Sequence, residues 1–188
     1  MKAIIFYLGI LLTTVLVSCN NRAGEVREIE NMSAKVDSMV QVSEVLAPAQ
    51  RQEAEEMLEK YEEFAKKYPE DSLAPLYLFK AAFLAASLPE YKKQIEIFDQ
   101  IAAEYPKTEY APQALALAAK SYTDYLNDKN KAKEYLVRLK NEYPESPYSV
   151  NIDLQIEYVG DDEGLFEATM AKKAVLDSID AVKKGTGK

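Results

Sequence analysis

Apolar residues recur every three or four positions along most of this chain, which is the spacing of one face of an α-helix. Three segments combine an apolar stripe with charged residues on the other side: Gln50–Lys67, Glu90–Glu104 and Asp128–Glu142. Between them lie two segments rich in Ala and Leu, Ala74–Ser87 and Ala111–Leu126. The pattern predicts an all-α protein in which amphipathic helices alternate with more apolar ones.

Prolines separate these segments at regular intervals. Tyr-Pro occurs at positions 68, 105 and 143, so the spacings are 37 and 38 residues, and Ala-Pro follows at positions 74 and 111. Proline is tolerated in the first turn of a helix and prevents a helix from running into it. Each Tyr-Pro is therefore expected to end one helix, and each Ala-Pro to open the next. A fixed period of this length indicates an array of helical hairpins.

The pattern weakens toward both ends of the chain. Glu25–Leu46 is expected to form the first helix, because its apolar residues Ile29, Met32, Val36 and Met39 follow a 3-4-3 spacing. After the last Tyr-Pro, the segment SPYSVNIDLQIEYV resembles a degenerate first helix of a hairpin. Leu165–Val182 is expected to close the array as a terminal capping helix, and residues 183–188 to form a disordered tail.

These residues resemble the tetratricopeptide repeat (TPR). The matching positions counted back from Pro106 are Leu78, Ala81, Ala82, Ala85, Gln94, Phe98 and Ile101. Those counted back from Pro144 are Leu115, Ala118, Ala119, Tyr122, Ala132, Leu136 and Leu139. The chain departs from the family in having Ala for Gly in both copies and Gln94 where a small Ala is expected. The resemblance implies a TPR-like helical-hairpin solenoid over residues 25–182. The longer period with paired prolines is similar to that of BamD-like envelope lipoproteins and of the periplasmic TPR protein that works with the Tol-Pal system.

In such an array the first helices of the hairpins line a concave groove that binds partners. The resemblance places the groove at Leu76, Phe79, Phe83, Gln113, Ala116, Lys120 and Asp124. Phe79 and Phe83 share one helix face, and with Lys120 they would hold an apolar peptide or helix. Two alternatives stay open. The Glu25–Leu46 helix could pack over these phenylalanines, or the same segment could form a short coiled coil.

The N-terminal residues have the pattern of a secretory signal. Lys2 precedes an apolar run from Ala3 to Val17, which is shorter than a membrane-spanning helix needs. The run ends in Leu-Val-Ser-Cys, which resembles the lipobox of bacterial lipoproteins and implies cleavage before Cys19 and acylation of that residue. Residues 1–18 would then be the signal peptide and 19–24 an acylated tether. The alternative is an ordinary signal peptide with an incidental cysteine.

Charge and composition narrow the function further. The chain has 31 acidic and 23 basic residues, no histidine and one cysteine. Nucleic acid is not an expected partner, because binding phosphates needs a basic surface. Without histidine, and with its only cysteine assigned to lipid, the chain is not expected to hold a Cys/His metal site, a cofactor or a His-based catalytic site. The acidic run at residues 161–163 lacks the spacing of a calcium loop and is expected to mark the start of a helix.

Taken together, these patterns predict a lipid-anchored scaffold or adaptor rather than an enzyme. It would bind envelope proteins or peptide segments, with Cys19 as its only attachment to the membrane. Asn20 after Cys19 favours the outer membrane, and the lack of acidic residues immediately behind it favours the periplasmic face. A surface-exposed accessory of a nutrient-uptake system is the alternative. The sequence leaves the identity of the partner and the oligomeric state open.

Overall fold

The computed structural model describes residues 21–38 and 46–185, and in these residues all regular secondary structure is helical. The predicted all-α class and its helical hairpins are thereby confirmed. Contacts divide the chain into two compact units, Met1–Pro89 and Glu90–Lys188, which we describe separately. The boundary between the units lies between two predicted helices, Ala74–Ser87 and Glu90–Glu104, which form the first complete repeat.

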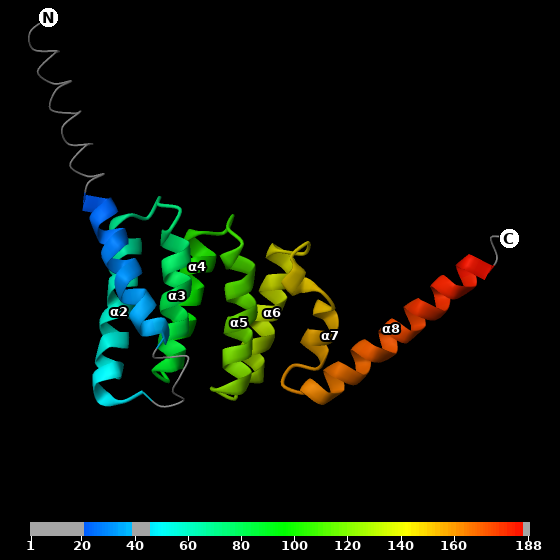
Figure 1. The fold of residues 1–188 in the computed structure, drawn as a ribbon. Helices are drawn as coiled ribbons and strands as arrows, with labels where there is room; N and C mark the ends of the chain where they lie inside the picture. The colour runs from blue at the N-terminus through cyan, green and yellow to red at the C-terminus, as the bar shows by residue number, and fades with distance from the viewer. Residues whose placement is uncertain (1–20, 39–45, 186–188) are drawn as a thin grey trace, which may run out of the picture. The chain divides into compact units, whose positions relative to one another are not determined.

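Unit 1 contains an N-terminal helix, described over residues 21–38, followed by α2 (Pro48–Lys67) and α3 (Ala74–Ser87). The N-terminal helix lies alongside this hairpin (Figure 1). The core between α2 and α3 is aromatic. The ring of Tyr77 lies 5.2 Å from that of Tyr61 and 4.8 Å from that of Phe64, measured between centroids. All three side chains are buried, so ring packing holds the two helices together.

Unit 2 begins with three neighbouring helices, α4 (Tyr91–Glu104), α5 (Tyr110–Asp124) and α6 (Lys129–Glu142). In this unit α5 packs against both α4 and α6 (Figure 1). Buried alanines on α5 let the neighbouring helices approach closely, and the largest buried side chains fill the space around them. These are Phe98, Ile97, Ile101, Leu115 and Leu139.

The helix ends confirm the predicted role of the prolines. Tyr68, Tyr105 and Tyr143 are the C-cap residues of α2, α4 and α6, and each donates its backbone N–H to the carbonyl four residues earlier at 2.8–2.9 Å. The prolines that follow cannot continue the helix. Pro75 and Pro112 lie in the first turns of α3 and α5. Each pair of prolines therefore brackets a turn between helices.

The buried residue Gln94, which departs from the TPR pattern, has a partner in the fold. Ser121 on α5 donates its hydroxyl to Gln94 Oε1 on α4 at 2.8 Å. Both side chains are buried, at 6 % and 3 % exposure for Gln94 and Ser121. A polar residue in this core position is therefore satisfied by a second polar residue on the adjacent helix.

The remainder of unit 2 is irregular before it becomes helical again. The segment expected to be a degenerate first helix forms a short 3-10 turn, η1 (Pro147–Ser149), and a six-residue helix, α7 (Ile152–Glu157). The last helix, α8 (Asp162–Gly185), starts as the acidic run predicts, since Asp161 Oδ1 accepts the backbone N–H of Gly164 at 3.0 Å.

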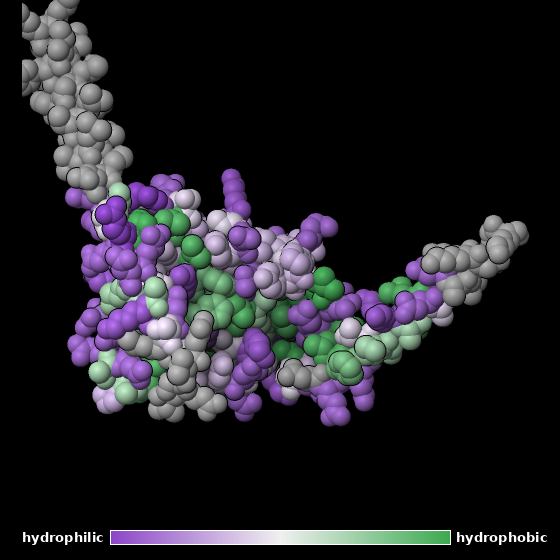
Figure 2. Space-filling model, viewed as in Figure 1, coloured by the Kyte–Doolittle hydropathy of each residue, from purple (hydrophilic) through white to green (hydrophobic). Residues whose placement is uncertain are grey.

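Helix α8 covers less of unit 2 than a terminal cap would. Leu165, in its first turn, lines a pocket with residues of α5 and α6, and Lys172 Nζ donates to Asn151 Oδ1 at 2.9 Å. Farther along, Val175, Leu176 and Ile179 are exposed, and Figure 2 shows hydrophobic as well as hydrophilic residues at the surface of this helix. The capping contact is therefore confined to the first part of α8.

Several predictions concern residues outside the described part of the chain. These are the signal peptide, the lipidation site Cys19 and the portion of the predicted first helix between residues 39 and 45. Among the helices that are described, none combines the length and the apolar character needed to cross a membrane.

Candidate partner-binding surfaces

The predicted groove residues of unit 1 form an apolar row along α3. Leu76 and Phe79 are half-buried, and Phe83 is 48 % exposed. The Phe79 and Phe83 rings meet edge to face with their centroids 5.1 Å apart. Helix α3 carries a single charged residue, Lys80, so it is apolar on nearly every side. One side of such a helix fills the core, and the other remains as an accessible hydrophobic surface.

The N-terminal helix reaches α3 at Lys80, which lies between the two phenylalanines in the sequence. The buried Ser33 accepts hydrogen bonds from Tyr61 Oη at 2.8 Å and from Lys80 Nζ at 3.1 Å, and Asp37 pairs with Lys80 at 3.8 Å. The described part of this helix thus contacts α3 at Lys80, and Phe83 is about half exposed. The alternative in which Glu25–Leu46 packs over the two phenylalanines stays a prediction. Burial raises the pKa of the Tyr61 hydroxyl.

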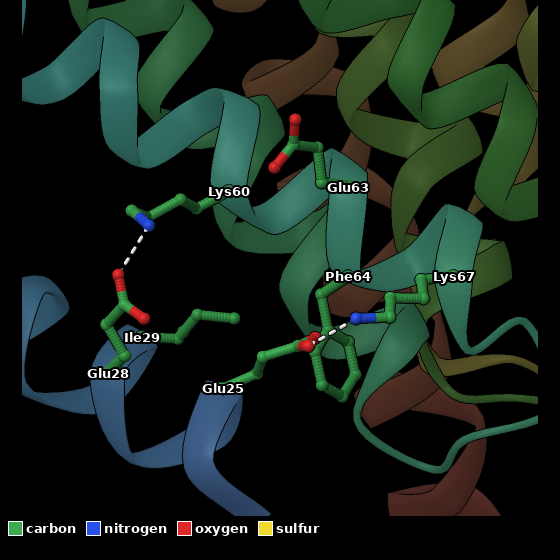
Figure 3. A pocket seen from close by; sticks show the side chains of 7 residues that line it. All are labelled: Glu25, Glu28, Ile29, Lys60, Glu63, Phe64 and Lys67. Atoms are coloured by element: carbon green, nitrogen blue, oxygen red, sulfur yellow. Dashed lines mark hydrogen bonds and ion pairs between the residues drawn. The ribbon is translucent and has the colours of Figure 1, made fainter. Parts of the chain in front are cut away.

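A pocket of about 160 Å³ lies between the N-terminal helix and α2 (Figure 3). Glu28 pairs with Lys60 at 2.6 Å, and Glu25 pairs with Lys67. The hydrogen bond with Lys60 lowers the pKa of Glu28, and the bonds with Glu28 and Glu25 raise the pKa values of the two lysines. In Figure 3, Ile29 points into the space between the helices. Because most of the charged side chains along it are paired with one another, we interpret this pocket as part of the interface that holds the N-terminal helix on α2.

A further ion pair fixes the start of this helix. The Arg22 guanidinium donates two hydrogen bonds to the Asp71 carboxylate, from Nε to Oδ2 and from Nη2 to Oδ1, the second at 2.9 Å. Asp71 also accepts the backbone N–H of Leu73 at 2.9 Å. The hydrogen bond from Arg22 is the main reason that the pKa of Asp71 lies below its ordinary value. This bidentate geometry is the strongest form of an arginine–carboxylate pair.

The predicted groove residues of unit 2 are divided between two pockets. Lys120 and Asp124, an ion pair at 2.7 Å on α5, line a pocket of about 190 Å³ together with Ala116. Its other walls are Ala119, Thr123, Leu136, Gln155, Tyr158, Val159, Gly160 and Leu165. A mainly uncharged pocket with one ion pair at its edge suits an apolar side chain that carries a polar end.

Gln113 lies at the other end of α5 and lines a different, larger pocket of about 550 Å³. This pocket includes the third Tyr-Pro pair, for which the sequence predicts only the end of a helix. Glu142 and Glu145 flank that pair in the sequence, and the fold adds Glu109 from the start of α5, a grouping that the sequence does not reveal.

The titratable groups in the body of unit 2 serve packing. Tyr135 donates its hydroxyl to Asp99 at 2.6 Å, and Arg138 pairs with the same carboxylate at 3.2 Å. Burial, together with the hydrogen bond to Asp99, raises the pKa of Tyr135. The bond links α6 to α4 across the unit. Within residues 21–38 and 46–185, no group of three or more Cys, His, Asp or Glu side chains is placed to hold a metal ion.

Comparison with known proteins adds no further constraint. The chain matches no protein-family model, no curated protein and no solved structure. The TPR resemblance therefore rests on the residues and the prolines described above.

Proposed function

We propose that this protein is a lipid-anchored adaptor or scaffold of the bacterial cell envelope, built from TPR-like hairpins. It would attach to the outer membrane through Cys19 and hold a partner protein on the periplasmic side, in outer-membrane assembly or envelope maintenance. Its role would be to bind and position the partner, without a catalytic residue or a cofactor of its own.

The observation that carries this proposal is the apolar row on α3. Phe83 is 48 % exposed, and its neighbour Phe79 is half-buried against it. Covering an exposed phenylalanine ring contributes about 1.5–3 kcal/mol when the ring becomes fully buried. Half of such a gain at Phe83, together with contributions from Phe79 and Leu76, is typical of the anchor of a peptide-binding surface.

In-cell photo-crosslinking tests this surface. A photoreactive phenylalanine analogue is placed at Phe83 or Lys120, and controls carry it at Glu59 of α2 or Lys92 of α4, which are exposed and lie outside the candidate surfaces. We expect one discrete envelope protein to be captured from Phe83 and not from the Glu59 control. Equal capture from the test and control positions would contradict a specific surface on α3.

The anchor requires a separate test. The Cys19→Ala variant should lose incorporation of labelled palmitate and leave the outer-membrane fraction. If the unmodified chain takes up no label, the lipoprotein assignment is wrong. Protease added to intact cells then separates the two orientations, because a periplasmic protein is protected whereas an accessory on the cell surface is degraded.

A further inference from the structure

The largest of the pockets described above is formed within unit 2, where α5 begins and α6 ends. Its volume is about 550 Å³. The lining residues are Glu109, Pro112, Gln113, Glu142, Tyr143, Pro144, Glu145, Ser146, Pro147 and Tyr148. Only Gln113 among them belongs to the predicted groove, so the proposed adaptor role leaves the pocket's chemistry unused.

The walls of this pocket are mainly apolar, and hydrogen bonds hold the turn that carries several of them. Proline and tyrosine rings line it, and Tyr148 is 38 % exposed. The turn that carries them is held by hydrogen bonds to the carbonyl of Tyr143, from the Ser149 hydroxyl at 2.7 Å and from the backbone N–H of Ser146 at 3.1 Å. The backbone N–H of Tyr148 donates to Ser146 Oγ at 3.2 Å. A ligand would therefore meet a preformed surface, which lowers the entropy lost on binding.

The charge at the pocket is negative. Glu109, Glu142 and Glu145 contribute carboxylates, and none of the lining residues is Lys or Arg. Glu142 pairs with Arg138 at 3.1 Å. In the part of the chain that the structure describes, the carboxylates of Glu109 and Glu145 make neither a hydrogen bond nor an ion pair. The C-terminal end of α6 and the N-terminal end of α5 both lie at the pocket, so their opposite dipole ends offset each other and the negative charge comes from the carboxylates.

We propose that this pocket binds an arginine side chain presented by a partner polypeptide. The guanidinium would meet the carboxylates of Glu109 and Glu145, and its aliphatic stem would lie against the proline and tyrosine rings. A metal ion is a poorer fit, because the described residues form no metal-binding cluster and the walls are mainly apolar. Arginine suits the site better than lysine, since its flat guanidinium stacks on tyrosine rings and binds carboxylates through two prongs. The inference goes beyond the adaptor role and does not depend on the lipid anchor.

The test compares two peptides of nearly the same shape, one with a charged guanidinium and the other with a neutral ureido group. Acetyl-Ala-Arg-Ala-amide, and the same peptide with citrulline in place of arginine, are titrated into the full 15N-labelled chain in detergent solution. We expect the arginine peptide to shift the amide signals of Gln113, Glu145, Ser146 and Tyr148, and the citrulline peptide to bind at least about fivefold more weakly. The double variant Glu109→Gln/Glu145→Gln should bind the arginine peptide about three- to tenfold more weakly, because it loses two exposed ion pairs. Glu55→Gln/Glu59→Gln is the matched control, with the same change of net charge at two exposed positions of α2.

Three results would overturn the inference. They are equal binding of the two peptides, equal weakening by the test and control variants, and no shift at these residues with millimolar arginine peptide. Because the titration uses the isolated chain, its failure leaves the crosslinking result at Phe83 unaffected. Conversely, loss of capture at Phe83 would not remove arginine binding at this pocket.

Discussion

The buried pair of Gln94 and Ser121 provides a quantitative test of the packing in unit 2. Its hydrogen bond, 2.8 Å long, is the polar contact that accommodates the departure of Gln94 from the TPR pattern. We consider Ser121→Ala, Gln94→Met and the double variant. Methionine keeps the length of the glutamine side chain while removing its polar groups, so the core loses little volume.

The two single substitutions should differ in their effects. Ser121→Ala leaves Gln94 Oε1 buried without its donor, and we expect the free energy of unfolding to fall by about 1–3 kcal/mol. Gln94→Met should lower it by only about 0.5–1.5 kcal/mol, because a serine hydroxyl in a helix can bond to a carbonyl of its own helix instead. The double variant removes both polar groups and should be within about 1 kcal/mol of the natural chain. At the middle of these ranges, the resulting coupling energy is about 2–3 kcal/mol.

Urea unfolding followed by circular dichroism at 222 nm measures these differences, provided that the slope with denaturant stays the same in all variants. Ser87→Ala is the control, because the Ser87 hydroxyl bonds to the carbonyl of Phe83 in its own helix on an exposed surface. It should change the free energy by less than about 0.5 kcal/mol. If the effects of the two single substitutions simply add in the double variant, the pair is not coupled and our explanation of Gln94 is wrong.

Three other predictions follow from unit 1, unit 2 and the composition. Stability should be nearly constant between about pH 5.5 and 7, because the chain has no histidine. Below this range it should decline, because folding lowers the pKa of Asp71. The contribution of Asp71 to stability is present above the ordinary pKa of 3.8 and is lost as the pH falls through the folded-state pKa. Acid titration followed by circular dichroism measures this loss. Asp71→Asn should weaken the attachment of the N-terminal helix by about 1 kcal/mol. Amide exchange should then become faster in residues 23–37 but not in α5, and unchanged exchange would contradict a role for the Arg22 pair. Phe98→Ala leaves a cavity at a fully buried site and should lower the free energy of unfolding by about 3–5 kcal/mol. Phe166→Ala, at an exposed position of α8, should change it by less than about 0.5 kcal/mol. Similar values for the two variants would refute the assigned core.

The helices themselves were predictable because their signals are local. Proline after tyrosine stops a helix whatever surrounds it, and the predicted end of α2 at Lys67 and both ends of α3 agree with the structure. The end of α5 was less accurate, since Leu126 lies beyond the observed last residue, Asp124. No proline marks that turn, and helix ends without such a signal are uncertain by one or two residues.

Contacts between helices were much harder to predict. The sequence identified Gln94 as unusual but gave no indication that Ser121 would be its partner, because the two residues are brought together only by the packing of α4 on α5. The TPR resemblance assigns Gln113 and Lys120 to one groove. Seven residues of helix separate them by about 10 Å along its axis, which places them in different pockets.

The order of the ion pairs along the N-terminal helix has a mechanical consequence. Arg22 meets Asp71, Glu25 meets Lys67, Glu28 meets Lys60, and Lys35 meets Glu53. The helix therefore runs antiparallel to α2, with its pairs arranged one after another from its N-terminal end. If the chain is tethered at Cys19, a pulling force reaches Arg22 first and opens these pairs one after another from that end. Under tension, the N-terminal helix would then separate from α2 in steps while the α2–α3 hairpin stays folded. Movement of the membrane relative to the partner would in this way be taken up by the N-terminal helix.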